Sequence, residues 1–405
     1  MTADTRQQRC PMHVAPDAVE WLDMLTDDAW LFDPHARMDG LRDGRRGVYA
    51  PNLVGLSGMG TWIFTHAEDI RTIMQDPETF RSSGPEPYGA VLGERWTLNP
   101  VLVDRPEHGY YRAILNPIFS PSRVAAMSGK LRKRAAELIE PLTGQSGCEI
   151  VETFCRPFPI SIFLELLGMP AEDMPLLMRC ERGLRGPVAE RTESIRTVRE
   201  RLAREIELRR HEPKDDLISY VIGSRLNGRE LTADQIMGIC FVLFIGGLAT
   251  VASALGFSFR YLAQHPEQQD KLRRDRSLIP AAVEELLRAY SPLSTKRIVS
   301  HDVVVGGVCL KRGDNITVPM MAANRDPAEF DNPGTVDFER EDNRHSAFGF
   351  GPHRCLGSHL ARREINIALE EWFDRMPPFR LGDDAPIRSI GANVVSLVQL
   401  PLRWD

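Results

Sequence analysis

Apolar positions recur at helical spacing along most of the chain, whereas strand-like runs are short. This periodicity predicts a strand at Thr61–Phe64 that leads into a helix at His66–Gln75. Further helices are expected at Ser122–Leu142, with Ser122 as N-cap, and at Ile195–Ile206, Pro280–Tyr290 and Leu356–Met376. Short strands are expected near residues 48–64, 298–320 and 379–403, including a hairpin at 303–308. The expected fold class is therefore mainly α with small β-sheets.

The longest apolar segment runs from Ile236 to Phe259 and contains no charged residue. Thr232 stands where an N-cap is expected. Length alone would allow a membrane span. Against a span, Gly246 and Gly247 lie at the centre of the segment, and charged amphipathic sequence flanks it on both sides. We therefore expect a buried helix through a large soluble domain, with a membrane-spanning helix as the alternative.

Composition excludes several classes of protein. Hydrophobic residues make up 42% and charged residues 26%, which is typical of a soluble globular chain and not of a disordered or polytopic one. The formal net charge of −6 gives no broad basic surface, so no nucleic-acid partner is expected. The seven cysteines are scattered and form no CxxC pair, which indicates a reducing, cytoplasmic location without disulfides. Without a linker, repeat or apolar leader, residues 1–405 are expected to form a single monomeric domain with no membrane contact.

The stretch Phe348–Gly357, with the sequence FGFGPHRCLG, is the most informative in the chain. Its glycines permit backbone angles that other residues resist. Cys355 falls where this loop becomes a helix, and the N–H groups and positive end of a helix favour a thiolate. Such a loop can present a thiolate to a metal. An inert buried cysteine in a glycine-rich turn is the alternative for an isolated motif.

The pattern FGxGxHxCxG resembles the haem-binding loop of the cytochrome P450 family, the haem-thiolate monooxygenases. The resemblance implies that Cys355 is the axial ligand of the iron of haem b, with Gly349 and Gly357 beside the cofactor. It also implies that the haem lies between the long apolar helix and the helix that follows Cys355. A thiolate in that position favours cleavage of the O–O bond.

Other features occur in the order that the family shows. Glu285 and Arg288 match its ExxR motif, and Arg340 would be the third member of a buried structural cluster. The alternative for ExxR alone is a surface salt bridge. The resemblance also implies that four basic residues hold the haem propionates: His108, Arg112, Arg297 and His353.

The long helix departs from the family pattern at one position. Gly246–Thr250 resembles the family's distal sequence, and the resemblance implies that the Thr250 alcohol orders water and protons near O2. The family's acid position is occupied by Ala249, which cannot carry a proton. Three interpretations stay open at this point: protons arrive through water and another group, the enzyme is poorly coupled, or Ala249 replaces an acid in an engineered variant.

The substrate pocket is expected to be apolar, because the resemblance implies oxidation of unactivated C–H bonds. The predicted lining residues are Tyr88, Trp96, Leu98, Leu243, Phe244, Gly247, Leu248, Leu293, Val299, Val394 and Val395. No carboxylate clamp stands out, so a small neutral hydrophobe of terpenoid type is favoured. The local pattern is most similar to the camphor-hydroxylase branch, in which the Trp96 stretch supplies a donor to a ketone.

No flavin, nicotinamide or [2Fe–2S] motif is present, so the resemblance implies electrons from an external [2Fe–2S] ferredoxin and its reductase. Arg354, Arg362 and Arg363 are predicted to form the docking patch, with Arg112 behind it. The expected function is O2-dependent hydroxylation. The alternatives are a peroxygenase that uses H2O2 and a haem protein that binds ligands without turnover.

Overall fold

The computed structural model describes residues 10–24, 27–53, 59–85, 87–382, 387–391 and 393–405. Its internal contacts divide the chain into two units. The first comprises Met1–Pro85, Glu284–Cys355 and Arg388–Val395; the second comprises Glu86–Val283, Leu356–Ile387 and Ser396–Asp405. The prediction of a single domain over residues 1–405 stays a prediction.

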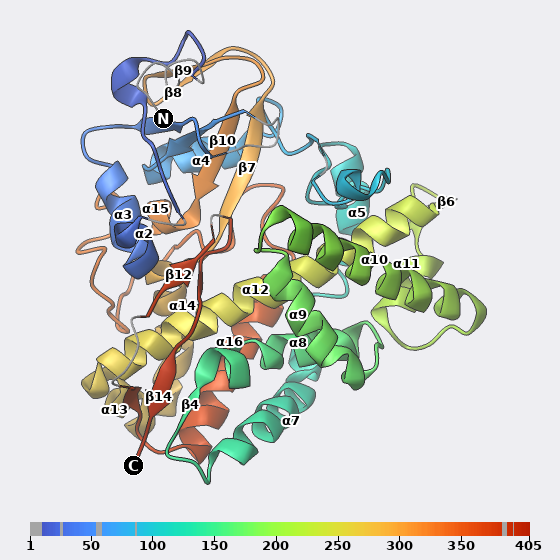
Figure 1. Ribbon diagram of the computed structural model, residues 1–405, viewed down its shortest axis with the longest axis vertical. Coiled ribbons are helices and arrows are strands. Elements are labelled where there is room, and N and C mark those ends of the chain that lie inside the picture. The colour runs from blue at the N-terminus through green and yellow to red at the C-terminus, as the bar shows by residue number, and fades with distance from the viewer. Residues whose placement is uncertain (1–9, 25–26, 54–58, 86, 383–386, 392) are drawn as a thin grey trace. The chain divides into compact units, whose positions relative to one another are not determined.

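The first unit is built on a five-stranded sheet of order β1-β2-β10-β7-β3. Strands β10 and β7 are labelled in Figure 1. The strands are β1 (Gly47–Ala50), β2 (Thr61–Phe64), β10 (Asn315–Pro319), β7 (Ser294–Val299) and β3 (Phe80–Arg81). Asn315 of β10 stands opposite Thr61 of the parallel strand β2 and opposite Ile298 of the antiparallel strand β7. Every residue of β1, β2 and β10 is buried, as expected for strands at the centre of a core.

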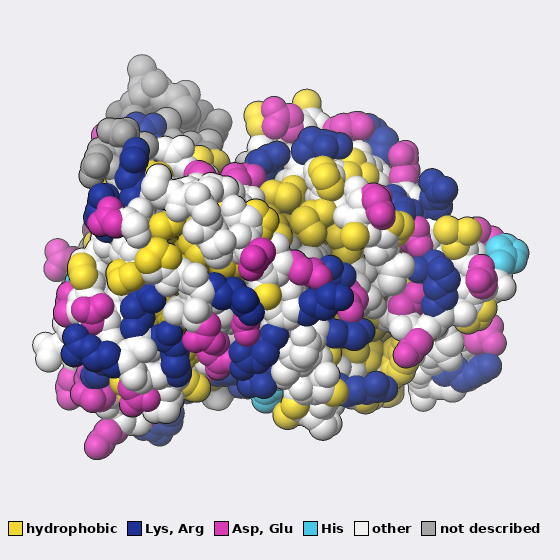
Figure 2. Space-filling model, turned by 90° about the horizontal axis from the view of Figure 1, so that it is seen from below, with side chains coloured by type: hydrophobic (Ala, Val, Ile, Leu, Met, Phe, Trp, Pro, Cys, Tyr) yellow, Lys and Arg dark blue, Asp and Glu magenta, His cyan; other side chains and the backbone are white. Residues whose placement is uncertain are grey.

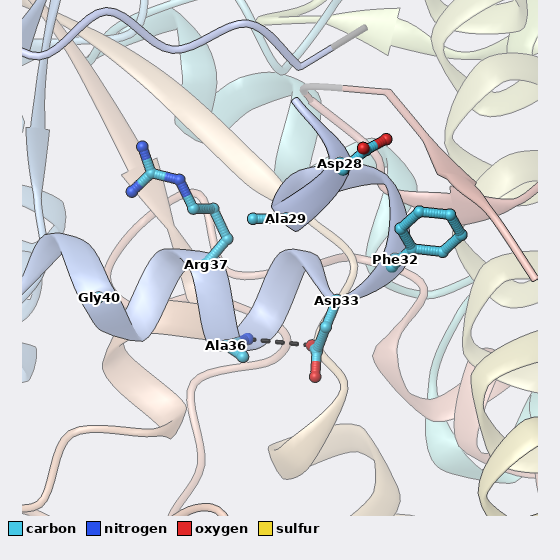
Figure 3. Close-up of a pocket in the computed structure, with 7 residues that line it drawn as sticks. All are labelled: Asp28, Ala29, Phe32, Asp33, Ala36, Arg37 and Gly40. Atoms are coloured by element: carbon cyan, nitrogen blue, oxygen red, sulfur yellow. Dashed lines mark hydrogen bonds between the residues drawn. The ribbon is translucent and has the colours of Figure 1, made fainter. Parts of the chain in front are cut away.

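Short helices and a hairpin complete the first unit. They are η1 (Pro16–Ala18), α2 (Asp28–Phe32), α3 (Pro34–Leu41), α4 (Ala67–Gln75), α15 (Met320–Asn324), the hairpin β8 (Val303–Val305)–β9 (Val308–Leu310), and β12 (Ser389–Ile390). A shallow groove runs along α2 and α3 (Figure 3), where the Asp33 carboxylate accepts a hydrogen bond from the Ala36 N–H at 3.0 Å. None of the predicted site residues lines this groove.

The second unit surrounds α12 (Ala233–Gln264), the long yellow helix of Figure 1. Thr232 is its N-cap, as predicted, and forms a capping box with Gln235. The helix packs against η4 (Val151–Cys155), α8 (Pro157–Leu166), α10 (Val188–His211) and α16 (Ser358–Arg375). In the described part of the chain it is the one helix long and apolar enough to cross a membrane, but 72% of its apolar window is buried inside the protein. This burial favours the interpretation as a core helix.

An aromatic cluster joins α12 to its neighbours within the second unit. The Trp372 ring lies 4.9 Å from Phe259, 5.6 Å from Phe154 and 6.0 Å from Trp404. A three-stranded sheet in the same unit has the order β11 (Arg380–Leu381)–β14 (Pro401–Arg403)–β4 (Gly147–Glu149). Burial of the large rings in the aromatic cluster around Trp372 is a major source of stability.

The remaining elements of the second unit are mostly helices. They are η2 (Ala90–Leu92), α5 (Glu107–Leu115), α6 (Pro121–Ala126), α7 (Ser128–Ile139), η3 (Glu140–Leu142), η5 (Ala171–Asp173), α9 (Met174–Gly183), α11 (Leu217–Gly223), the hairpin β5 (Arg225–Leu226)–β6 (Arg229–Glu230), α13 (Pro266–Arg274), η6 (Arg276–Leu278) and β13 (Ser396–Leu397). Helix α14 (Ile279–Ala289) continues from the second unit into the first.

Two predicted boundaries were wrong. Ser122 does not cap a helix, because the helix begins at Pro121 with Ser120 as N-cap, and Pro is favoured at the first helical position. The predicted helix 122–142 is also divided at Met127, so that α6 and α7 are separate. The fold class, mainly α with small sheets, is confirmed. On the face shown in Figure 2, Lys and Arg side chains are interspersed with Asp and Glu.

Candidate functional site

The cysteine loop of the first unit is closed by its own backbone. The Cys355 N–H donates to Phe348 O at 2.8 Å, and the Gly349 N–H donates to Ser346 O at 2.7 Å. Gly351 has φ +66°, and a Cβ there would stand 2.4 Å from Met74 O, so only glycine fits. The loop therefore holds Cys355 in one place, shortly before α16 begins at Ser358.

Cys355 differs from the buried cysteines of the chain. Burial raises the pKa of the Cys240 thiol to about 12, and it raises the pKa of Cys155 and that of Cys180 above the usual range of a thiol. These three side chains are kept as thiols. Cys355 is half-buried and precedes the N-terminal end of an 18-residue helix, where a thiolate is favoured.

The structure brings Glu285, Arg288 and Arg340 together in a buried ion cluster in the first unit. Arg288 Nε and Nη2 donate to the two Glu285 carboxylate oxygens at 2.7 Å each. Its other N–H groups donate to the carbonyls of Asn324, Pro333 and Thr335 at 2.8–2.9 Å. Arg340 Nε lies 3.1 and 3.2 Å from the same carboxylate. This arrangement ties α14 to the segment that leads into the cysteine loop.

Two residues beside the cysteine loop form hydrogen bonds that the sequence did not predict. Asn324 is buried, and its Oδ1 accepts from the Ser346 N–H at 2.6 Å, while its Nδ2 donates to Ser291 Oγ at 2.6 Å. His345 Nδ1 accepts from the Ala347 N–H at 3.2 Å, so its Nε2 carries the proton toward Glu284, 3.0 Å away. No local signal in the sequence marks the partners of Asn324.

The other predicted residues of the first unit lie on the sheet and near the C-terminus. Arg297 is buried on β7, and its Nη1 donates to Lys296 O at 2.7 Å and to Thr295 Oγ1 at 3.2 Å. Leu293 forms an isolated bridge with Val394. Val299 and Val395 are buried in the core, and His353 is half-buried in the cysteine loop.

Helix α12 is open at one place. Between Ile236 and Phe259 every residue is buried except Ile245, Gly246, Gly247, Ala249 and Thr250. A Cβ at Gly246 would meet no atom within 4 Å, whereas a Cβ at Gly247 would stand 2.6 Å from the Phe163 ring. Gly246 therefore leaves free space, and Gly247 is needed for packing against α8. Thr250 Oγ1 donates to Gly246 O at 2.9 Å.

The predicted aromatic substrate residues gather along α12 within the second unit. The Trp96 and Tyr88 rings lie 4.7 and 5.4 Å from Phe241. Leu98, Leu243, Phe244 and Leu248 are buried. The Trp96 indole N–H donates to the Glu94 carboxylate, which also pairs with Arg199 Nε at 2.8 Å. While that bond holds, this N–H is not available to the predicted substrate ketone.

The predicted basic residues of the second unit lie on α5 and α16. His108 is buried and Arg112 half-buried, four residues apart on α5. Gly357 is the N-cap of α16, and its carbonyl accepts from the Ala361 N–H at 2.9 Å. Arg362 and Arg363 follow in the first turns, where Arg363 Nε donates to Ser128 Oγ at 2.9 Å.

Comparison with known proteins agrees with the motifs. A family model described as Cytochrome P450 matches residues 166–376. Probable cytochrome P450 127A1 of Sinorhizobium fredii is 36% identical over 413 residues, covering 99% of this chain and 100% of the relative. A pentalenic acid synthase of Streptomyces avermitilis is 32% identical, covering 92% of this chain and 95% of the relative. The crystal structure of cytochrome P450 CYP101C1 aligns with a TM-score of 0.88 at 33% identity, covering 98% of this chain and 100% of that one.

The chain belongs to the cytochrome P450 family. It is an oxidoreductase, a monooxygenase with haem b as cofactor. A substrate, O2 and a redox partner follow from membership of this cytochrome P450 family. The predicted family, fold, enzyme class and cofactor are therefore confirmed.

Two observations show that the residues of this cytochrome P450 fit a haem. The cysteine loop holds the Cys355 thiol in a fixed place. A single thiol on a rigid loop is the donor expected for iron that is held by a porphyrin. In addition, α12 is uncovered at Gly246, where a flat ligand and O2 need space.

Proposed function

We propose that this cytochrome P450 inserts one oxygen atom of O2 into a C–H bond of a small, neutral, hydrophobic substrate of terpenoid type. The observation that carries the proposal is the open stretch of α12 at residues 245–250, which interrupts an otherwise buried helix. Aromatic and aliphatic side chains surround this helix, and no charged residue lies between Ile236 and Phe259. An apolar, uncharged substrate suits such a wall.

The residues that hold the cofactor are assigned from the family motifs and their surroundings. Cys355 would bind the iron, and His108, Arg112, Arg297 and His353 would hold the propionates, with Gly349 and Gly357 beside the ring. When bound, haem b supplies the reduction and cleavage of O2. The buried positions of His108 and Arg297 support this assignment, because cationic or donor groups pair strongly with carboxylates in a dry environment.

Thr250 is assigned to hold a water molecule and its proton near O2. Its hydroxyl has one proton, which is donated to Gly246 O, so its lone pairs can accept a hydrogen bond from water. The methyl group of Ala249 cannot carry a proton. Thr250→Ala should therefore lower the yield of product per electron and raise release of H2O2, whereas Ala249→Asp should raise turnover. Ser258→Ala, which removes a similar hydroxyl bonded to Ala254 O at 2.7 Å, is the matched control.

The experiment that tests the substrate class is ferredoxin-driven turnover of a panel of neutral terpenoids and of carboxylated analogues of the same size. Hydroxylated products from the neutral members alone are expected. Preferential oxidation of the carboxylates would overturn the substrate class. Trp96→Phe removes the indole N–H, and a loss of regioselectivity confined to ketones would assign that donor to the substrate instead of Glu94.

An external [2Fe–2S] ferredoxin, with its reductase, is proposed as the electron donor to this monomeric, cytoplasmic enzyme. Arg354, Arg362 and Arg363 lie near Cys355 in the sequence, and we assign them, together with Arg112, to the docking patch. Charge reversal at Arg362 and Arg363 should slow reduction and weaken its salt dependence. Arg274→Glu, at a side chain that is 82% exposed on α13, is the control. An unaffected rate would remove these residues from the interface.

A second candidate function is a peroxygenase that uses H2O2 directly, and the alanine at position 249 favours it. Product formed with H2O2 as the sole oxidant is the test. A rate at least equal to that of ferredoxin-driven turnover would support the peroxygenase. A much lower rate would leave the O2-dependent reaction as the physiological one.

A further inference from the structure

A chain of hydrogen bonds runs through the second unit from a buried ion cluster to the open stretch of α12. Arg185 Nη1 donates to Ser396 Oγ at 2.7 Å, and Ser396 Oγ lies 2.5 Å from Ser253 Oγ. Ser253 Oγ then donates to Ala249 O at 2.6 Å. This hydrogen-bond chain joins Arg185 to Ser396, which are 211 positions apart in the sequence, and Ser396 to Ser253, which are 143 positions apart. It ends at Ala249, the residue before Thr250.

The chemistry of the donors gives this chain one direction. An arginine can only donate, so Ser396 accepts from Arg185 and retains its own proton. The single proton of Ser253 is committed to Ala249 O, so Ser396 must be the donor between the two serines. Each hydroxyl therefore polarises the next, from the guanidinium to the Ala249 carbonyl.

The cation at the start of the chain is held in place. Arg185 pairs with Glu181, whose side chain is only 4% exposed, and Glu181 also pairs with the buried Arg156. Burial lowers the pKa of Arg185, and the neighbouring Glu181 opposes that shift. Arg185 is thus a positive charge held in place by Glu181, and outside this ion cluster it donates to the neutral hydroxyl of Ser396.

The last hydrogen bond of this series, from Ser253 to Ala249 O, affects the backbone geometry of α12. Hydroxyls that bond to the carbonyl four residues earlier bend a helix slightly. Thr250 bonds in this way to Gly246 O and Ser253 to Ala249 O, so both bonds fall on the open stretch. Ser258 makes the same bond to Ala254 O, but no described residue outside the helix bonds to the Ser258 hydroxyl.

We infer that Arg185, Ser396 and Ser253 are positioning residues that set the backbone of α12 at Ala249 and thereby the place of the Thr250 hydroxyl. The inference rests on the proposed role of Thr250. With alanine at position 249, no side-chain charge on that turn can perform this positioning. A hydroxyl chain that ends on the backbone performs it instead.

The test compares Ser396→Ala with Ser258→Ala in the holoenzyme, with Ser396→Thr as the conservative variant. The first readout is hydrogen exchange of the α12 amides at residues 249–254, which requires no turnover. Losing one anchoring hydrogen bond should speed exchange there about fivefold in Ser396→Ala. Ser258→Ala and Ser396→Thr should leave exchange at these amides as in the wild type.

The second readout is the H2O2 released per electron consumed, measured with Thr250→Ala alongside. Ser396→Ala should shift this ratio toward that of Thr250→Ala, and Ser396→Thr should restore it. If Thr250→Ala alters the ratio but Ser396→Ala behaves as Ser258→Ala in both readouts, the positioning chain is overturned. If Thr250→Ala leaves the ratio unchanged, the proposed role of Thr250 has failed instead.

Discussion

Two buried ion clusters, one in each unit, differ in how their hydrogen bonds end. Around Glu285, every N–H of Arg288 is used, and the carboxylate also accepts from Arg340, Asn343 and the Asp337 N–H. Around Glu181, Arg156 Nε makes no hydrogen bond among the described residues, and Arg185 passes one bond on to Ser396. The first cluster is closed on itself, whereas the second is open toward α12.

The difference suggests different uses for similar residues. A buried ion pair stabilises only when nearly all of its donors and acceptors are satisfied. The Glu285 cluster meets that condition and holds the segment before Cys355. The Glu181 cluster meets that condition less fully, and Arg185 donates one hydrogen bond toward the open stretch of α12. Glu364 on α16 is a third case, because it is buried without a cation in the described structure, and burial raises its pKa to about 8.

The largest effect is expected when the closed cluster is broken. Arg288→Met leaves the buried Glu285 carboxylate partly unpaired and frees three backbone carbonyls. The free energy of unfolding should fall by about 3–5 kcal/mol, measured by urea denaturation. Arg344→Met, whose side chain is 88% exposed in its pair with Asp342, should leave it almost unchanged. Equal losses in the two variants would refute the closed-cluster interpretation.

The next effect comes from the uncompensated carboxyl of Glu364. Its pKa is raised in the folded state, so the protonated form is stable there while the unfolded chain ionises near pH 4 to 5. Stability from this group is therefore full below about pH 4 and is lost as the pH rises toward 8. The wild type should lose up to roughly 4 kcal/mol over this range relative to Glu364→Gln. A constant difference between the two unfolding curves from pH 5 to 8 would contradict this.

A smaller loss of stability is expected when the Glu181 cluster loses the charge of Arg185. Arg185→Gln retains a donor for Ser396 and leaves Glu181 paired with Arg156. The free energy of unfolding should fall by about 1–2 kcal/mol in the same urea assay, less than for Arg288→Met. A loss as large as that of Arg288→Met would show that both clusters are structural in the same sense.

The smallest effect is expected at the pair of Glu94 and Arg199, where the side chains are 27% and 37% exposed. Glu94→Gln should lower the free energy of unfolding by less than about 1 kcal/mol, and the loss should shrink in high salt. A salt-independent loss above 2 kcal/mol would place this pair with the buried clusters.

Features carried by neighbouring residues could be predicted from the sequence. The cysteine loop, the Glu285–Arg288 spacing and the Thr232 cap each depend on a few positions along one segment. The partners of Gly247 and Arg185 could not be predicted, because Phe163 and Ser396 reach them from distant segments. The Ser122 cap failed for a local reason, since Pro121 sets the first helical turn and moves the cap to Ser120.

The assignment of Cys355 as the axial ligand is tested most directly by the absorption spectrum of the reduced, carbon-monoxide-bound protein. The wild type and Cys309→Ser, which changes an exposed cysteine on β9, should both show the band of a haem with a thiolate ligand. Cys355→Ser should lose that band while retaining its fold by circular dichroism. A thiolate band that persists in Cys355→Ser would contradict the assignment.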